Sequence, residues 1–306
     1  MRIVVHGQQA FGKSVLEALL KRSEQVIAVY CAPEKPGQRP DPLKEAALAH
    51  GLPVYQPRSF RKQEVWEEFA TLRADLCVMA YVTLFVPEEM LNLPTHGTIQ
   101  YHPSLLPRHR GPSSINWPII WGETKTGLTI FWPDNGLDTG PILLQEEVEI
   151  RDTDTLGSLY FDKLYPLGVE ALLAAVDMVR NGTAPRIPQD ESLATYEGWC
   201  KQEHVQIDWH KPVQEVWNLI RGADPQPGAW STYQGQMVQL YEAQKLLDVP
   251  TAAPGEVTAV EAERFTVAVQ GGQIAIRRAR PAEGAKMLAA DFIKHTGLRT
   301  GARLGT

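Results

Sequence analysis

The sequence predicts an α/β protein: a Rossmann-like, mainly parallel sheet with flanking helices, followed by a small C-terminal β-barrel that is OB-like. Two observations predict this fold class. Apolar β-type runs alternate with helical patterns through the first 150 residues, which is typical of parallel strands joined by crossover helices. From about residue 225 onward, short β-type runs broken by Gly and Pro replace that pattern and indicate a small barrel.

The first part of the chain shows strand and helix patterns in alternation. Strands are expected at residues 2–7, 25–31, 52–57, 75–82, 96–102, 127–132 and 141–150. Helices are expected between them, at residues 13–22, 42–50 and 64–72. The last strand ends in the alternating run LLQEEVEI, which indicates a half-exposed edge strand. A helical periodicity through residues 152–182, closed by Asn181-Gly182, predicts a long helix covering one face of the sheet.

A polar stretch without sustained periodicity separates this part from the β-rich remainder. We therefore expect a first domain at residues 1–182, a linker at 183–205 and the C-terminal barrel at 206–306. The barrel domain begins with a short amphipathic helix and continues in β-type runs, at residues 212–222, 228–243, 255–260 and 264–279.

Charge and cysteine content exclude several functional classes. The formal net charge is -6 without a block of like charges, so no nucleic-acid partner is expected. Cys31, Cys77 and Cys200 are far apart and lack CxxC spacing, which predicts buried thiols in a reducing cytoplasm and no zinc site. No apolar run is long enough for a signal or membrane segment, so we expect a cytoplasmic protein without a membrane partner.

The run GQQAFGKS at residues 7–14 fits the phosphate-binding pattern G-x-x-x-x-G-K-[ST]. A P-loop enzyme also needs an acidic residue at the end of a buried strand to hold magnesium, and only Asp134, after an interrupted apolar run, offers one. The alternative is a tight strand-to-helix turn whose helix N-terminus attracts an anionic group. A nucleotide enzyme stays open on these grounds.

A different group of polar residues lies where two expected strands end. Gln100 and His102 point to the same side of their strand, because side chains alternate with a period of two. Asp138 follows the next strand and is expected at the same edge of the sheet. A carboxylate beside an imidazole can accept a proton from a nucleophile, although a buried structural histidine and an Asx-turn aspartate are ordinary alternatives. No nucleophile with a base at motif spacing is visible, which favours direct transfer over covalent catalysis.

Two longer runs, HPSLLPRHRGPSSINW and GLTIFWPDNGLDTGPILLQ, resemble the formyltransferase family that uses N10-formyltetrahydrofolate as one-carbon donor. IDWHKPVQEVWNLIRGADPQPGAW and AADFIKHTGLRTGARL are similar to the family's C-terminal barrel domain, so the resemblance covers most of the chain. Within the family, the residues of these runs most resemble the hydrolase domain of 10-formyltetrahydrofolate dehydrogenases, and they are also similar to methionyl-tRNA formyltransferases. The resemblance implies that Lys13-Ser14 is incidental, because the family's first turn does not bind ATP.

The resemblance implies catalytic roles for Gln100, His102 and Asp138 without a metal or a covalent intermediate. Asp138 would take or position the proton of the nucleophile, while His102 and Gln100 stabilise a tetrahedral oxyanion. Arg108 and Arg110 would face the acceptor or the folate tail, with structural or surface ion pairs as an equal alternative. The residues implied to hold the folate co-substrate are Tyr81, Val82, Phe85, Val86, Asp134, Gly136 and Leu137.

Two departures from the family pattern concern the acceptor. Transferases of the family have Asn where this chain has Gln100, and the hydrolase domain has an apolar residue there and a cysteine in place of Val82. The amide at position 100 favours transfer to an amine of a small molecule. The connection at residues 32–47 is short and balanced in charge, unlike the longer basic insertion of members that formylate methionyl-tRNA. Water, methionyl-tRNA and a non-catalytic folate-binding role are the alternatives, and the oligomeric state stays open.

Overall fold

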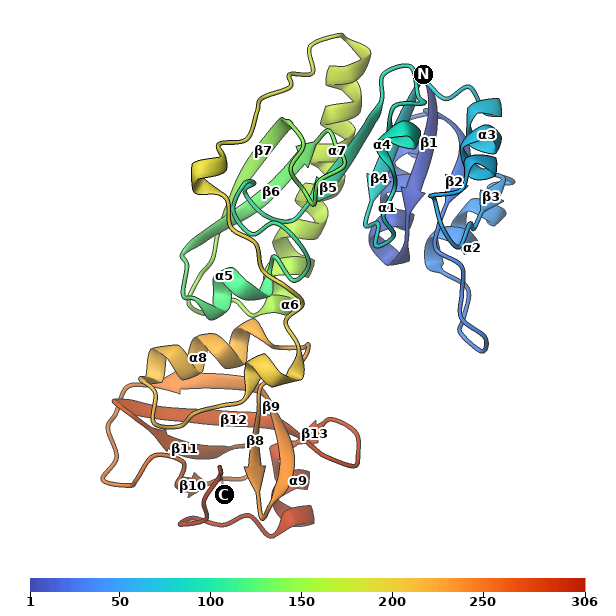
Figure 1. Ribbon diagram of the computed structural model, residues 1–306. Coiled ribbons are helices and arrows are strands. Elements are labelled where there is room, and N and C mark those ends of the chain that lie inside the picture. Colours follow the sequence, from blue (N-terminus) through green and yellow to red (C-terminus); the bar gives the residue numbers. More distant parts are fainter. Residues whose placement is uncertain (306) are drawn as a thin grey trace. The chain divides into compact units, whose positions relative to one another are not determined.

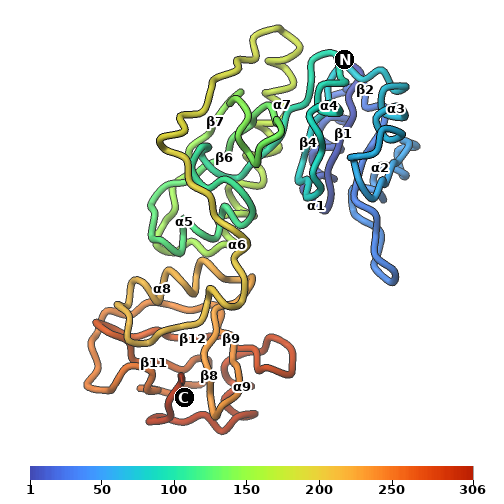
Figure 2. Tube along the Cα trace, in the orientation of Figure 1, coloured from blue at the N-terminus to red at the C-terminus, as the bar shows by residue number. Residues whose placement is uncertain are grey.

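The computed structural model of the protein describes residues 1–305, which form two compact units (Figures 1 and 2). Unit 1 comprises Met1–Gly111, Gly127–Val148 and Asp162–Tyr196, and unit 2 comprises Pro112–Thr126, Glu149–Phe161 and the chain from Glu197 onward. Unit 1 contains a mainly parallel sheet with flanking helices and unit 2 a curled antiparallel sheet, which confirms the predicted fold class. The domain boundaries at residues 182 and 205 stay predictions.

The sheet of unit 1 has seven strands in the order β3-β2-β1-β4-β5-β6-β7. β1 to β5 pair in parallel, and β6 runs antiparallel to β5. The strand order reverses between β1 and β4, which is the point where open α/β sheets leave a crevice for a ligand. β7 lies at the edge, as its alternating tail predicts. The strands span Arg2–Gly7, Gln25–Tyr30, Val54–Tyr55, Leu76–Ala80, Thr98–His102, Lys125–Phe131 and Ile142–Glu149.

Helices cover both faces of this sheet (Figure 1). On one face α1 packs beside α7, and the ring of Phe11 lies 4.5 Å from that of Tyr101 in β5. A separate apolar cluster, which includes Tyr30, Phe69 and Met79, forms around α3 and α4. The helices of this part are α1 (Gln9–Lys21), α2 (Pro42–Ala49), α3 (Gln63–Thr71), α4 (Glu88–Leu91) and α7 (Tyr165–Arg180).

The long helix predicted at residues 152–182 is interrupted. A single helical turn, α6 (Leu156–Ser158), leads into a π-helical turn at Leu159–Leu164, and α7 follows. Pro166 has no N–H to donate to the carbonyl four residues earlier, so the regular α-helical pattern cannot pass through this point. The predicted helix is therefore present from Leu156 to Arg180, but it contains a π-helical turn and lacks the first four residues, and α7 lies against the sheet.

Unit 2 contains an antiparallel sheet in the order β10-β11-β12-β9-β8, with β13 paired to β12. The hairpin from β8 to β9 turns at Gln234-Gly235, both with positive φ, as tight two-residue turns require. The sheet curls around an apolar core that includes Trp209, Leu240 and Phe265. The strands are Trp230–Tyr233, Gln236–Leu246, Val257–Val260, Phe265–Val269, Gly272–Pro281 and Met287–Leu288, and the helices are α5 (Asn116–Ile120), α8 (Val213–Gly222) and α9 (Ala289–Thr296). In residues 1–305 no helix has both the length and the apolar character needed to cross a bilayer.

Candidate active site

The turn after β1 lacks the loop that a P-loop enzyme needs. α1 begins at Gln9, so most of residues 7–14 are helical and do not form a cradle of free backbone amides. A Cβ atom at Gly7 would lie 2.2 Å from the carbonyl oxygen of Ala80, so this glycine serves the close approach of β1 and β4. Lys13 lies 3.7 Å from Glu17 on the same helix, where it makes an exposed ion pair.

An anion from the chain itself already occupies the N-terminus of α1. The backbone N–H of Gln9 donates to both carboxylate oxygens of Asp41, at 2.9 Å each. Asp41 is buried and also caps α2 by accepting the backbone N–H of Leu43. The positive end of the helix dipole is thus satisfied by a fixed carboxylate, not by a ligand.

His102 closes β5, with Gln100 on the same face of the strand. Nε2 of His102 lies 2.8 Å from the backbone carbonyl oxygen of His109. Since a carbonyl oxygen can only accept, Nε2 carries a proton. Nδ1 of His102 lies 3.6 Å from Oδ2 of Asp138, and both side chains are buried. Nδ1 can therefore donate a hydrogen bond only when the imidazole is doubly protonated.

Asp138 reaches His102 through its loop. β6 runs antiparallel to β5, with Phe131 opposite Gln100, so strand direction alone does not bring the end of β6 to the end of β5. The loop at residues 132–141 carries Asp138 back beside His102. The predicted pairing of Asp138 with His102 is present, but its cause differs from the shared strand edge that the sequence indicated.

The Asp138 carboxylate is held in a defined orientation. Oδ2 accepts the backbone N–H of Gly111 at 2.8 Å, while Oδ1 has no hydrogen-bond partner among residues 1–305. Asp138 itself has φ 57°, in the left-handed region, which costs an L-residue roughly 1–2 kcal/mol. Such strained residues cluster at functional sites. Oδ1 is free to take a proton from a substrate.

Gln100 offers an unengaged amide. Its side chain is half-buried and forms no hydrogen bond with the described part of the chain, residues 1–305. An amide can both donate and accept, so it can stabilise a developing oxyanion on the face that it shares with His102.

Two loops with exposed apolar side chains lie next to one another at this site. Tyr81 and Phe85, in the loop after β4, are 45% and 48% exposed, and Leu137 in the Asp138 loop is 55% exposed. The loops are joined because the backbone N–H of Glu88 donates to Oδ1 of Asn135 at 3.2 Å and the Asn135 amide donates back to the Glu88 carboxylate at 2.7 Å. Exposed apolar groups gathered in this way make the two loops a candidate binding surface.

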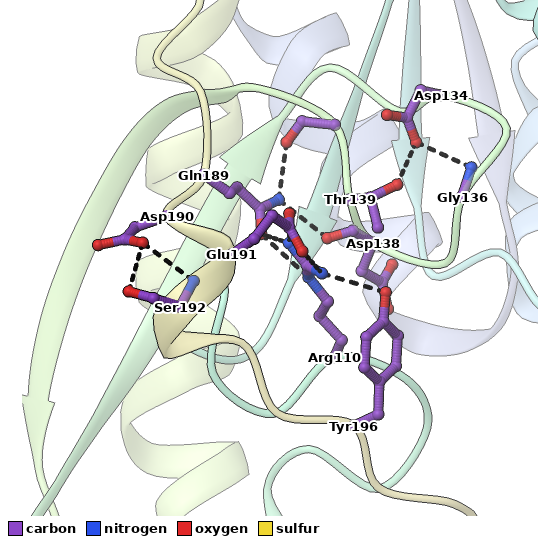
Figure 3. Close-up of polar contacts among 11 residues, drawn as sticks. Arg110, Asp134, Gly136, Asp138, Thr139, Gln189, Asp190, Glu191, Ser192 and Tyr196 are labelled. Atoms are coloured by element: carbon purple, nitrogen blue, oxygen red, sulfur yellow. Dashed lines mark hydrogen bonds and ion pairs between the residues drawn. The ribbon is translucent and has the colours of Figure 1, made fainter.

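The other predicted folate contacts play different parts. Val86 is buried in the apolar cluster around α3, and Val82 is half-buried against it, so Val86 can offer a ligand only its backbone. Asp134 accepts the backbone N–H of Gly136 at 3.0 Å and the hydroxyl of Thr139 at 2.6 Å, which shapes the loop (Figure 3). Their roles in folate binding stay predictions.

Two family descriptions match the sequence. The formyl transferase family matches residues 1–176, and the formyl transferase C-terminal domain matches residues 200–297. Methionyl-tRNA formyltransferase of Alkaliphilus oremlandii is 35% identical over 310 residues, and the match covers 100% of each chain. The chain belongs to the formyl transferase family. This confirms the resemblance drawn from the sequence runs around His102 and Asp138.

Further relatives in the formyl transferase family share part of their length with this chain. Mitochondrial 10-formyltetrahydrofolate dehydrogenase of Mus musculus is 43% identical over 263 residues, which are 84% of this chain and 28% of that protein. The chain thus spans 28% of the relative's length. The crystal structure of HypX from Aquifex aeolicus in complex with tetrahydrofolic acid has a TM-score of 0.72 at 22% identity, covering 96% of this chain and 47% of HypX. That likeness shows a shared fold.

Arg110, one of the two arginines predicted to face the acceptor or the folate tail, lies in a buried network of hydrogen bonds. Its side chain is 1% exposed, and the guanidinium donates to Gln189, Glu191 and Tyr196 (Figure 3). The hydrogen bond with Glu191 raises the pKa of Arg110 and lowers that of Glu191. Arg110 thus makes the structural ion pair that was the alternative to a ligand contact. Arg108 is exposed, and its contact with the acceptor or the folate tail stays a prediction.

The sequence did not predict a role in the site for Gln189, Glu191 or Tyr196. They lie in a segment whose composition indicated only a linker, and no periodicity marks them. None of the three cysteines is suited to act as a nucleophile, because the reactive form is the thiolate. Burial raises the pKa of the Cys31 and Cys77 thiols to about 12, and that of the partly exposed Cys200 thiol to about 11. Residues 1–305 contain no group of three or more His, Cys, Asp or Glu side chains arranged to hold a metal ion.

Proposed function

We propose that the protein transfers the formyl group of N10-formyltetrahydrofolate to an amine of a small-molecule acceptor. The observation that carries the proposal is the buried pair of His102 and Asp138, with Nδ1 and Oδ2 3.6 Å apart and Oδ1 available. An imidazole and a carboxylate in this arrangement can stabilise an oxyanion and take a proton without a covalent intermediate.

The folate donor is supported by the two apolar loops. Tyr81, Phe85 and Leu137 offer exposed apolar surface for a pterin ring. The backbone groups of residues 82–85 form no hydrogen bond within residues 1–305, so they can pair with the polar edge of the ring. The mouse relative is named for 10-formyltetrahydrofolate, and HypX was crystallised with tetrahydrofolic acid.

In the proposed reaction the amine nitrogen attacks the formyl carbon, and the carbonyl electron pair moves onto oxygen. Protonated Nδ1 of His102 and the amide of Gln100 donate to this oxyanion. Oδ1 of Asp138 removes a proton from the attacking nitrogen. When the oxyanion collapses, the bond between the formyl carbon and N10 breaks, and N10 takes the proton from the Asp138 carboxyl. The products are the formamide and tetrahydrofolate.

Water is the second candidate acceptor. The 43% identity to a 10-formyltetrahydrofolate dehydrogenase over 84% of this chain favours it, because hydrolysis of the same donor needs the same oxyanion and base. The unengaged amide of Gln100 favours transfer, since the resemblance places an apolar residue at this position in hydrolase domains.

A tRNA acceptor is less well supported, although one full-length relative is a methionyl-tRNA formyltransferase. Nζ of Lys44, in the first turn of α2, lies 3.0 Å from the carboxylate of Glu34 in the connection between β2 and α2. Burial raises the pKa of Glu34, but hydrogen bonds from Lys44 and Gln56 outweigh this and hold it at about 2, so the partner stays charged. Lys44 is therefore not available for a phosphate contact, and the connection itself offers only two exposed cations, Lys35 and Arg39, which make a weak basic surface for a nucleic acid.

Incubation with N10-formyltetrahydrofolate alone tests the proposal. A transferase binds the donor and releases formate only slowly until a suitable amine is added, and formamide then forms in proportion to tetrahydrofolate. Rapid formate release without an amine would identify the hydrolase instead. No binding of the donor would contradict both. The Asp138→Asn variant is the control, because it should bind the donor and release neither product.

A further inference from the structure

We infer that Gln189 is a positioning residue, whose side-chain amide holds the backbone of the Asp138 loop so that the carboxylate faces His102. Its effect on turnover rests on the proposed function, whereas its effect on the geometry of the loop does not. Gln189 lies outside the implied catalytic motif and reaches it from the segment at residues 187–196, which we call the strap.

All the hydrogen-bonding groups of the Gln189 amide are engaged (Figure 3). Nε2 donates to the backbone carbonyl oxygen of Asp138 at 2.9 Å and to that of Gly140 at 2.7 Å. Oε1 accepts from Nε of Arg110 at 3.1 Å and from Nη2 at 2.8 Å. The amide thus connects the buried guanidinium of Arg110 to the backbone carbonyl groups of Asp138 and Gly140, the residues before and after Thr139.

Arg110 fixes which way the amide points. A guanidinium can only donate, and a carbonyl oxygen can only accept, so Oε1 must face Arg110 and Nε2 must face the loop. The remaining donors of Arg110 bind the Glu191 carboxylate at 2.6 Å and 2.9 Å and the Tyr196 hydroxyl at 3.1 Å. Because Arg110 is 1% exposed and fully engaged, it cannot swing away and release Gln189.

The strap is attached to the rest of unit 1 near both ends. Ile187 exchanges two backbone hydrogen bonds with Ile142, at 2.8 Å and 2.9 Å. At the other end, the backbone N–H of Thr195 donates to Pro107 at 3.1 Å, and its carbonyl accepts from Arg110 at 3.0 Å. Gln189 therefore stands on a segment held by β7 and by the loop after His102.

The Asp138 loop needs such an external restraint. Asp138 adopts φ 57°, and a Cβ atom at Gly140 would lie 1.7 Å from the carbonyl oxygen of Trp132, so the backbone turns tightly on both sides of Thr139. Without the Gln189 donors, two carbonyl groups lose their partners and the strained conformation can relax. A misplacement of about 1 Å at a catalytic group can lower the rate on the order of 100-fold.

The Gln189→Glu variant separates positioning from folding. A glutamate has nearly the same shape and keeps an acceptor for Arg110, so the strap stays attached. It presents no donor to the carbonyls of Asp138 and Gly140 and repels them instead. We expect kcat to fall about 10- to 100-fold, with the KM for the folate donor and the melting temperature close to those of the wild type.

The matched control is Asp190→Asn, the next residue in the strap. The exposed Asp190 carboxylate accepts from the backbone and hydroxyl of Ser192 and does not touch Arg110 or Gln189. It should keep wild-type kcat. Should Gln189→Glu not fold, Gln189→Met removes the same donors without adding charge, and the same kcat loss is expected from it.

Hydrogen exchange of the Gly111 amide provides a readout without folate. This N–H donates to Oδ2 of Asp138, so a displaced carboxylate exposes it to solvent. We expect faster exchange of Gly111 in Gln189→Glu and unchanged exchange in Asp190→Asn. Unchanged Gly111 exchange, or wild-type kcat, in Gln189→Glu overturns the inference. If the wild type shows no formyl turnover, the proposed function fails, and the Gly111 result alone decides whether Gln189 positions the loop.

Discussion

The Asp138 loop and the loop after β4 are built in opposite ways, although hydrogen bonds between Asn135 and Glu88 join them. The Asp138 loop is restrained from three directions: by Asp134 from within, by Gly111 at the carboxylate and by Gln189 at the backbone. The loop at residues 81–86 has exposed aromatic side chains, and its residues 82–85 make no backbone hydrogen bond within residues 1–305.

This difference assigns the two loops separate tasks. A group that takes a proton must be held in place before the substrate arrives, because reorganisation during the reaction raises the barrier. A surface that binds a flat ring must instead leave apolar area and backbone groups open until the ring covers them. Changes at Asp138 and His102 should therefore lower kcat, and changes in the loop at residues 81–86 should raise the KM for the donor.

The largest expected effect follows from Asp138→Asn. The amide has nearly the same shape but cannot accept a proton, so turnover should fall about 10²- to 10⁴-fold while the fold and folate binding are kept. Steady-state kinetics and calorimetric titration with tetrahydrofolate measure the two quantities. Near-wild-type turnover would remove Asp138 from the mechanism.

His102→Ala should come next, with a loss of about 10²- to 10³-fold in kcat, since an oxyanion contact acts mainly in the transition state. Donor affinity should change much less than kcat. His102→Gln serves as the comparison, because it retains a donor without charge and should recover part of the rate. A raised KM with unchanged kcat would mean that His102 binds the donor and does not stabilise the oxyanion.

Phe85→Ala should show the opposite pattern. The Phe85 ring is half exposed, with the Arg61 guanidinium 5.3 Å from its centroid, and it is available to a pterin ring. Loss of an aromatic contact worth about 0.5–1.5 kcal/mol raises the KM for the donor up to about 10-fold and leaves kcat unchanged. Leu48→Ala, an exposed apolar side chain on α2, is the matched control. A fall in kcat without a rise in the KM for the donor would contradict the assignment of donor binding to the loop at residues 81–86.

An effect on stability, separate from the two loops, concerns the buried His6 in β1. Burial lowers the pKa of His6 to about 3, and its ring packs 4.7 Å from that of Phe60. His6 takes up a proton near pH 6.5 in the unfolded chain but not in the folded chain. Its effect on the free energy of unfolding is therefore absent above pH 6.5. Between pH 6.5 and pH 3 it lowers that free energy by at most about 1.4 kcal/mol per pH unit. Thermal melting of His6→Leu should show a shallower loss between pH 6.5 and pH 4. An identical slope in both proteins would contradict this role of His6.

The sequence predicts the fold class because the periodicities of strands and helices are local signals. It fails where a signal depends on partners distant in the chain. The direction of β6 depends on its pairing with β5, which no local pattern specifies. The helix predicted at residues 152–182 contains a π-helical turn at Leu159–Leu164, just before Pro166, and the apolar periodicity gives no sign of this turn.

The candidate site shows the same limit. His102 and Asp138 could be predicted because they stand in long, specific motifs. Gln189 could not, because the loop groups that it binds are backbone carbonyls, which exist at every residue and leave no trace in the sequence. Likewise, the anion at the start of α1 is Asp41, 32 residues away from Gln9, and only the fold brings them together.

Hydrogen exchange followed residue by residue, with and without tetrahydrofolate, tests the contrast between the two loops most directly. The amides of Gly111 and Gly136 donate to carboxylates and should be protected in the free protein, with little change on binding. The amides of residues 82–85 should exchange freely until tetrahydrofolate is added, and then become protected. Free exchange at Gly111 before binding, or no added protection at residues 82–85 in the saturated complex, would contradict the account.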